Sequence, residues 1–154
     1  MRIVLASGNR HKAEELTRLL PGMSVEPYAG ELPPETGSSF LENALIKARA
    51  VHEALGGEAW VLADDSGIEA RALGGVPGIR SARYAGDGAT DEQNLRKLLD
   101  ALAEEDDRAV AYVAELVAIA PDGETRTVAE MSAAEKDAIS HRARAAEGLR
   151  ELLP

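Results

Sequence analysis

The chain has 154 residues, of which 45% are hydrophobic and 29% charged, a composition typical of a soluble globular protein with a buried core. Its formal net charge of −10 argues against general nucleic-acid binding, which needs a basic face. The lack of cysteine excludes disulfides, thiolate zinc sites and a cysteine nucleophile, and no apolar run approaches the roughly 20 residues of a membrane span. Because residues 1–6 are too short for a signal peptide, we expect a cytoplasmic protein.

The N-terminal part of the chain alternates short apolar runs with a helical pattern. Residues 3–6 predict a buried strand that stops at a Ser-Gly-Asn turn. A helix is predicted from about Lys12 to Leu20, where Pro21 and Gly22 end it. Residues 23–28 then predict a second strand.

The middle of the chain predicts a second helix and a third strand. Ser39 and Glu42 fit a capping box, in which the Glu42 carboxylate reaches back to the Ser39 amide. This helix extends to about Leu55. Residues 60–63 predict a strand that ends at Asp64.

The remaining residues predict a further helix and a long strand. A capping box at residues 90–93 precedes an amphipathic helix. A β pattern covers residues 109–120 and ends in a hairpin-type turn at residues 121–123. Helical patterns return near residue 132 and over residues 141–153. The apolar positions of the amphipathic helix are Leu95, Leu98, Leu99 and Leu102.

The order of these elements predicts an α/β fold with a mixed central β-sheet flanked by helices. The long β pattern over residues 109–120 favours antiparallel pairing on one side of that sheet. No repeat or linker divides the sequence, so we expect a single domain over residues 1–154.

The turn after the first strand is the first candidate site. A turn between a strand and a helix presents backbone N–H groups that suit phosphate, and Arg10 and Lys12 add positive charge. The spacing is not that of a Walker A loop. An ordinary strand-to-helix turn with a Ser or Asn cap explains the same residues equally well. The residues of the turn are Ser7, Gly8, Asn9, Arg10, His11 and Lys12.

Three carboxylates form the second candidate site. Asp64 and Asp65 follow an apolar strand, where open α/β sheets bind ligands, and a cation would relieve the repulsion between them. Oxygen ligands point to Mg²⁺ or Mn²⁺, with Glu42 as a candidate third ligand and one carboxylate able to activate water. The alternatives are an Asx-type turn at the two aspartates and a purely capping role for Glu42.

The third candidate site is a basic group near the C-terminus. Lys136, His141 and Arg142 could hold an anion or the edge of a purine. A solvated helix face explains the same residues without a ligand. A serine hydrolase is excluded because the chain has no Gly-x-Ser-x-Gly elbow.

Together and in this order, these segments resemble the inosine triphosphate pyrophosphatase family. The resemblance covers residues 1 to about 120 and 129 to about 150. The matching segments are Leu-Ala-Ser-Gly-Asn-x-x-Lys at residues 5–12, Glu-Thr-Gly-x-x-Phe-x-Glu-Asn-Ala at 35–44, Ala-Asp-Asp-Ser-Gly at 63–67, Gly-Gly-x-Pro-Gly-x-x-Ser-Ala-Arg-Tyr-Ala-Gly at 74–86, Asn-x-x-Lys-Leu-Leu at 94–99, and Ala-Glu-Met-x-x-x-Glu-Lys-x-x-Ile-Ser-His-Arg at 129–142.

The resemblance implies a homodimeric, Mg²⁺-dependent enzyme, with Mn²⁺ as a second possible metal. It would hydrolyse noncanonical purine nucleoside triphosphates (dITP, ITP, XTP or dXTP) to the monophosphate and pyrophosphate. By resemblance, residues 7–12 hold the triphosphate, and Glu42, Asp64 and Asp65 hold the metal. Asp65 is also implied as the proton acceptor for the attacking water. The implied substrate contacts are Ser66, Lys136, His141 and Arg142, the last two near the purine.

One feature of that family is missing. Its members carry a Gly-Phe-Gly-Tyr-Asp-Pro motif that helps to form the base pocket, before the Ala-Glu-Met segment. Here residues 123–128 run directly into Ala-Glu-Met, and Phe40 is the only phenylalanine, so the chain is shortened between about residues 124 and 131. Ala143 also stands where a glycine is usual. Two alternatives therefore stay open, an unselective nucleoside triphosphate pyrophosphatase and a non-catalytic nucleotide-binding remnant.

Overall fold

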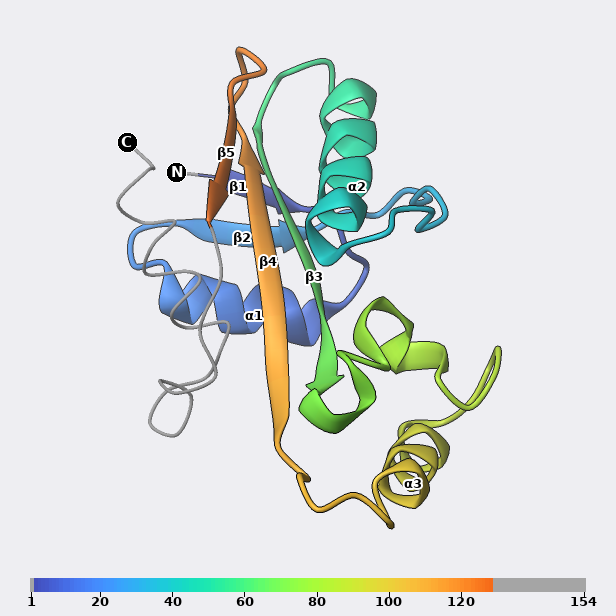
Figure 1. Cartoon of the computed structure of the whole chain (residues 1–154). Helices are drawn as coiled ribbons and strands as arrows, with labels where there is room; N and C mark the ends of the chain where they lie inside the picture. The colour runs from blue at the N-terminus through green and yellow to red at the C-terminus, as the bar shows by residue number, and fades with distance from the viewer. Residues whose placement is uncertain (1, 129–154) are drawn as a thin grey trace. The chain divides into compact units, whose positions relative to one another are not determined.

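The computed structural model describes residues 2–128 (Figure 1). Contacts divide these residues into two compact units. Unit 1 comprises residues 2–65 and 114–128, and unit 2 comprises residues 66–113. Strands β3 and β4 each contain residues of both units, and the single domain expected from the sequence stays a prediction.

A five-stranded sheet has the strand order β2-β1-β3-β4-β5 (Figure 1). Strand β1 (Arg2–Leu5) runs parallel to both β2 (Ser24–Pro27) and β3 (Trp60–Ala70). Strands β4 (Val110–Ile119) and β5 (Thr125–Val128) pair antiparallel across the predicted turn. The prediction of an α/β fold with a mixed sheet is therefore confirmed.

Helices α1 (Arg10–Leu19) and α2 (Phe40–Ala54) pack against opposite faces of the sheet in unit 1. Successive residues of a strand point to opposite faces, so each strand contributes alternate side chains to two separate cores. The α1 core includes Ile3, Leu5, Leu16, Leu20 and Leu62. The α2 core includes Val4, Ala44, Ala48, Val51, Val61 and Ala63.

Both helices of unit 1 begin at a side-chain cap. The Asn9 side chain accepts a hydrogen bond from the Lys12 amide at 3.2 Å, so the interpretation of this turn as an Asn cap is correct. The Ser39 hydroxyl accepts the Glu42 amide at 3.1 Å. The predicted reciprocal bond is wrong by one residue, because the Glu42 carboxylate accepts from the amide and hydroxyl of Ser38 instead of the Ser39 amide.

Strand β3 is longer than the sequence predicted. It was expected to end at Asp64, yet it continues to Ala70 with Asp64, Asp65 and Ser66 inside it. The alternative of an Asx-type turn at the two aspartates is therefore wrong. Carboxylates are tolerated inside this strand because lysines from the flanking helices pair with them, as described below.

Unit 2 is built around helix α3 (Asp91–Ala101) and two short 3-10 helices, η1 (Arg71–Leu73) and η2 (Gly78–Arg83). The predicted capping box is confirmed, since the side chains of Thr90 and Gln93 each bond the other residue's backbone amide. This unit therefore starts its main helix as the sequence predicts.

The apolar stripe of α3 is only half buried. Leu98 and Leu102 are each 4% exposed and pack with Ala70 in a small core. Leu95 and Leu99, on the same predicted stripe, are 52% and 56% exposed. Only two of the four leucines on this face of α3 are therefore buried in the core of unit 2.

Two further expectations about helices concern other parts of the chain. The helical patterns near residue 132 and over residues 141–153 lie outside the described residues. Among residues 2–128, the structure has no helix with the length and apolar character that crossing a bilayer requires.

Candidate active site

Parallel pairing of β1 and β3 brings the first two candidate sites together in unit 1. Leu5 lies opposite Leu62, and the Ala6 amide donates to the Leu62 carbonyl at 2.7 Å. The turn that follows β1 therefore lies beside the residues that follow Leu62. As a result, Lys12 Nζ lies 2.8 Å from Asp64 Oδ2.

Asp64 and Asp65 pair with lysines from different elements. Because they are consecutive residues of a strand, their side chains point to opposite faces of the sheet. Asp64 meets Lys12 of α1, whereas Asp65 Oδ1 lies 2.8 Å from Nζ of Lys47 in α2. Each carboxylate thus has its own ammonium partner, and the expectation that a metal ion binds between the two aspartates stays a prediction.

Lys47 is a residue that the sequence analysis missed. Its Nζ donates to Asp65 Oδ1 at 2.8 Å, to Glu35 Oε1 at 2.9 Å and to the Asp64 carbonyl at 3.0 Å. It is only 7% exposed. A signal was present, because a lysine within the buried stripe of a helix needs a carboxylate partner. That stripe consists of Phe40, Asn43, Ala44, Lys47, Ala48 and Val51.

Asn43 fixes the second oxygen of Asp65. It is fully buried, and its Nδ2 donates to Asp65 Oδ2 at 3.3 Å. Its Oδ1 accepts the Gly37 amide at 2.8 Å. A Cβ at Gly37 would lie 2.7 Å from that same Oδ1, so the close approach requires glycine. The loop before α2 and the Asp65 carboxylate are thus held by one amide side chain.

The charges around Lys47 shift two pKa values. Burial raises the pKa of Asp65 above its ordinary 3.8, and the nearby Glu35 charge adds to this, although Lys47 and Asn43 act in the opposite direction. Burial lowers the pKa of Lys47, but the hydrogen bonds and charges of Asp65 and Glu35 outweigh it, so that pKa is raised overall. At Asp65 burial outweighs the ammonium group of Lys47, whereas at Lys47 the two carboxylates outweigh burial. A buried carboxylate with a raised pKa suits the role of proton acceptor.

Glu42 is oriented by Ser38. Its Oε2 accepts the Ser38 amide at 2.6 Å and the Ser38 hydroxyl at 2.7 Å. These bonds, the hydroxyl first, lower the pKa of the exposed Glu42 carboxylate. Glu42 is therefore ionised and points toward the loop before α2.

The predicted metal ligands do not form one compact cluster. Among residues 2–128 no three His, Asp or Glu side chains are grouped closely enough to hold an ion by themselves. Mg²⁺, however, is usually held by one or two carboxylates together with phosphate oxygens and water. Glu42, Asp64 and Asp65 are all oxygen donors, so one or two of them could hold Mg²⁺ together with the oxygens of a bound phosphate.

The turn after β1 exposes backbone groups where a ligand can reach them. The Ser7 hydroxyl accepts the Asn9 amide at 3.2 Å, and Gly8, Arg10 and His11 are exposed. The first turn of α1 contains no acidic residue that would repel an anion. A capped helix start and a phosphate-binding turn are therefore compatible in the same residues.

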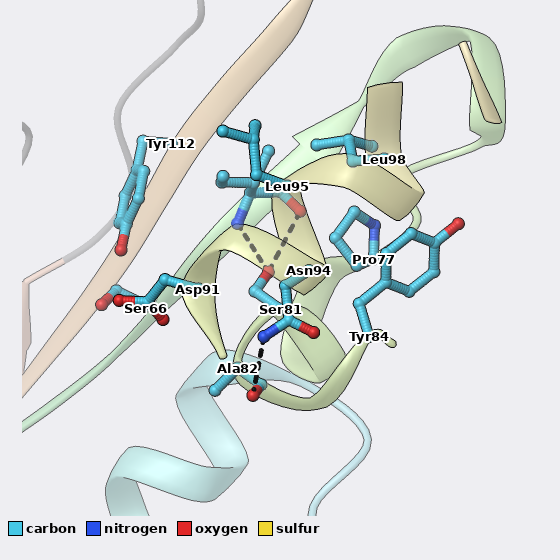
Figure 2. Close-up of a pocket in the computed structure, with 11 residues that line it drawn as sticks. Ser66, Pro77, Ser81, Ala82, Tyr84, Asp91, Asn94, Leu95, Leu98 and Tyr112 are labelled. Atoms are coloured by element: carbon cyan, nitrogen blue, oxygen red, sulfur yellow. Dashed lines mark hydrogen bonds between the residues drawn. The ribbon is translucent and has the colours of Figure 1, made fainter. Parts of the chain in front are cut away.

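Ser66 lines a pocket of about 330 Å³ within unit 2. Figure 2 shows Tyr112 on one side of this pocket and Tyr84 with Pro77 on the opposite side. The substrate contact expected for Ser66 stays a prediction. The other expected substrate contacts, Lys136, His141 and Arg142, lie outside the described residues.

Comparison with known proteins decides the family. A sequence model of the Ham1 family matches residues 3–126 and 118–152. This chain belongs to the Ham1 family. The resemblance inferred from the sequence motifs is thereby confirmed.

Relatives of this Ham1-family chain include proteins named dITP/XTP pyrophosphatase. One from Nautilia profundicola is 44% identical over 125 residues, which cover 78% of this chain and 64% of the relative. The chain thus spans less than two thirds of that relative. One from Frankia alni is 40% identical over 198 aligned positions, covering 99% of this chain and 97% of the relative. The solved Ham1 protein of Staphylococcus aureus has a TM-score of 0.82 and 33% identity, over 99% of this chain and 97% of its own.

Proposed function

We propose that the protein hydrolyses noncanonical purine nucleoside triphosphates, such as dITP, ITP, XTP or dXTP, to the monophosphate and pyrophosphate. The observation that carries this proposal is the buried Asp65, held between Lys47 and Asn43 and preceded by Asp64, which pairs with Lys12 of the turn after β1. The printed names of the relatives support the same activity.

The residues divide the chemistry between them. Asp65 accepts a proton from the attacking water, whose oxygen bonds to phosphorus as the phosphoanhydride bond between the α- and β-phosphates breaks. The leaving pyrophosphate keeps the electron pair of that bond. Lys12 and the N–H groups of residues 7–11 offset phosphate charge, and Lys47 orients the Asp65 carboxylate.

Mg²⁺ is the metal that we propose for the site, with Mn²⁺ as a substitute. Glu42, Asp64 and Asp65 would hold it together with phosphate oxygens. The metal supplies charge neutralisation to the phosphate groups when it is bound. EDTA is therefore expected to stop turnover.

Base recognition involves four further residues. Ser66, Lys136, His141 and Arg142 are proposed to contact the substrate, and no Gly-Phe-Gly-Tyr-Asp-Pro motif is present to form a base pocket. Because that motif is missing, an unselective nucleoside triphosphate pyrophosphatase and a non-catalytic nucleotide-binding remnant stay as alternatives. The cytoplasmic location and the homodimer also stay predictions.

One assay separates these possibilities. Pyrophosphate release is measured for dITP, XTP, dGTP and ATP with the purified chain, in Mg²⁺ and in EDTA. Preferential, metal-dependent cleavage of dITP and XTP is the expected result. Equal cleavage of all four would favour the unselective enzyme, and no cleavage by a folded chain would favour the remnant.

The Asp65→Asn variant tests the proton acceptor. It keeps the volume of the side chain and is expected to lower kcat by about 10²- to 10⁴-fold, the usual contribution of general base catalysis. Circular dichroism and thermal unfolding check that the variant is folded. Turnover close to the native value would show that Asp65 is not the base.

A further inference from the structure

Unit 2 contains a basic pocket that the proposed function does not use. The pocket has a volume of about 400 Å³ and lies between helix η2 and helix α3. Three of its lining residues are cations and none is a carboxylate. This composition is unusual in a chain whose formal net charge is −10. The three cations are Arg80, Arg83 and Lys97.

The wall of the pocket is held in place by hydrogen bonds. Lys97 Nζ donates to the Tyr84 carbonyl at 2.6 Å and lies 4.6 Å from the centre of the Tyr84 ring. The buried Asn94 accepts the Ala85 amide at 2.8 Å and donates to the Ala82 carbonyl at 3.0 Å. The segment that carries Arg83 and Tyr84 is therefore fixed to α3 before any ligand binds.

Two of the three cations of this pocket have no carboxylate partner among residues 2–128. Within the described residues, neither Arg80 nor Lys97 forms an ion pair with a carboxylate. The neighbouring Arg96, in contrast, lies 3.7 Å from Asp100. Like charges gathered in one concave site repel each other, and a bound anion would offset that repulsion.

We propose that this pocket binds a phosphate-bearing anion of about the size of pyrophosphate. Arginine guanidinium groups match phosphate oxygens in geometry and charge, and Arg80 and Lys97 together match an anion that carries more than one negative charge. Free pyrophosphate and the phosphate groups of a nucleotide share this chemistry. The proposal does not rest on catalysis by unit 1, because binding is measured without turnover.

The test is calorimetric titration of the full chain with inorganic pyrophosphate, in the absence of Mg²⁺. All titrations use a Lys12→Ala background, which weakens the turn in unit 1, so that the remaining binding reports on unit 2. Arg80→Ala is expected to weaken that binding about tenfold, as the loss of a charge-assisted hydrogen bond does. Arg96→Ala removes the same charge from the adjacent helix face and is expected to leave the affinity unchanged. Arg80→Lys keeps the positive charge and is expected to retain part of the affinity for pyrophosphate.

Parallel titrations with AMP and with a single-stranded oligonucleotide identify the source of the phosphate. Binding of pyrophosphate or AMP that Arg80→Ala weakens and Arg96→Ala does not would support the proposal. Binding that disappears in the Lys12→Ala background, or that both arginine variants weaken equally, would overturn it. Tight binding of the oligonucleotide alone would also overturn it, in favour of a nucleic-acid backbone.

Discussion

Lys47 carries one positive charge between two carboxylates, Asp65 and Glu35. The pKa of Asp65 is raised by burial and by Glu35 and lowered by Lys47. Because the base must be deprotonated, the acid limb of kcat/KM is expected to lie above pH 3.8, the ordinary value of an aspartate. The pKa of Asp65 is higher in the folded chain than in the unfolded chain. Asp65 therefore adds to the free energy of unfolding below pH 3.8, and this contribution is lost as the pH rises through the folded pKa.

Two variants of this charge cluster are expected to move the acid limb in opposite directions. Lys47→Met removes the positive charge and the hydrogen bond that lower the pKa of Asp65, so the acid limb shifts to higher pH. Glu35→Gln removes a negative charge that raises the pKa, so the limb shifts to lower pH. The measurement is the pH profile of kcat/KM for dITP hydrolysis.

Opposite shifts in these two variants would distinguish electrostatic control from loss of structure. Lys47→Met leaves a buried carboxylate without this partner and is also expected to cost about 3–5 kcal/mol of unfolding free energy. A structural defect alone would lower kcat without moving the limb. Shifts of the same sign in both variants would contradict the assigned charges.

Lys12 links the phosphate-type turn to the buried Asp64. Lys12→Ala is expected to raise KM for the triphosphate about tenfold, since a charge-assisted contact to phosphate is lost, with a smaller change in kcat. Steady-state kinetics at saturating Mg²⁺ check this. An unchanged KM would remove Lys12 from the binding role.

Helix α2 positions the site through its first turn. The Ser39 cap starts the helix that carries Asn43 and Lys47. Ser39→Ala is expected to lower the unfolding free energy by about 1 kcal/mol, the usual cost of losing an N-cap, and to lower turnover as the first turn frays. Chemical denaturation and pyrophosphate release measure the two effects.

Thr90→Ala is the matched control for this element. It removes the same kind of cap from α3 in unit 2. A similar loss of about 1 kcal/mol is expected, with turnover unchanged. If both variants lowered turnover equally, the effect of Ser39 would be one of general stability and not of its position in α2.

Most elements of the fold were predictable because their signals are local. Capping residues and apolar spacing predicted α1, α2 and α3, and short apolar runs predicted β1 and β2. The continuation of β3 to Ala70 was not predictable in this way. Two adjacent aspartates are typical of a turn, and only their distant lysine partners allow them to remain in a strand.

Exposed apolar side chains in the described part of the chain are concentrated in unit 2. The large hydrophobic residues that are exposed there are Val76, Leu95, Leu99, Val110 and Tyr112. Leu95 and Leu99 lie one turn apart on α3, and exposed apolar residues on one helix face are typical of a surface that meets a partner. If this surface contributes to the predicted homodimer, Leu95→Glu is expected to shift the protein to the monomer in light scattering. Arg96→Glu, at the next position of α3, is the control and is expected to leave the dimer intact.

The predicted shortening of the chain concerns the molecule as a whole. The alignment with the Frankia alni relative is longer than the chain itself, so that relative has positions without a counterpart here. The internal shortening between about residues 124 and 131 stays a prediction.

The sequence by itself determined the three described α-helices, the first strands and the family, and it singled out Asp64, Asp65 and Lys12 as candidate site residues. These features rest on local spacing and on motifs that are contiguous in the chain. Only the tertiary structure decided which cation meets which carboxylate. Lys47 and Asp65 are 18 residues apart and meet because strand residues alternate between faces and α2 covers the face of Asp65. That pairing depends on packing between elements, which no local pattern encodes.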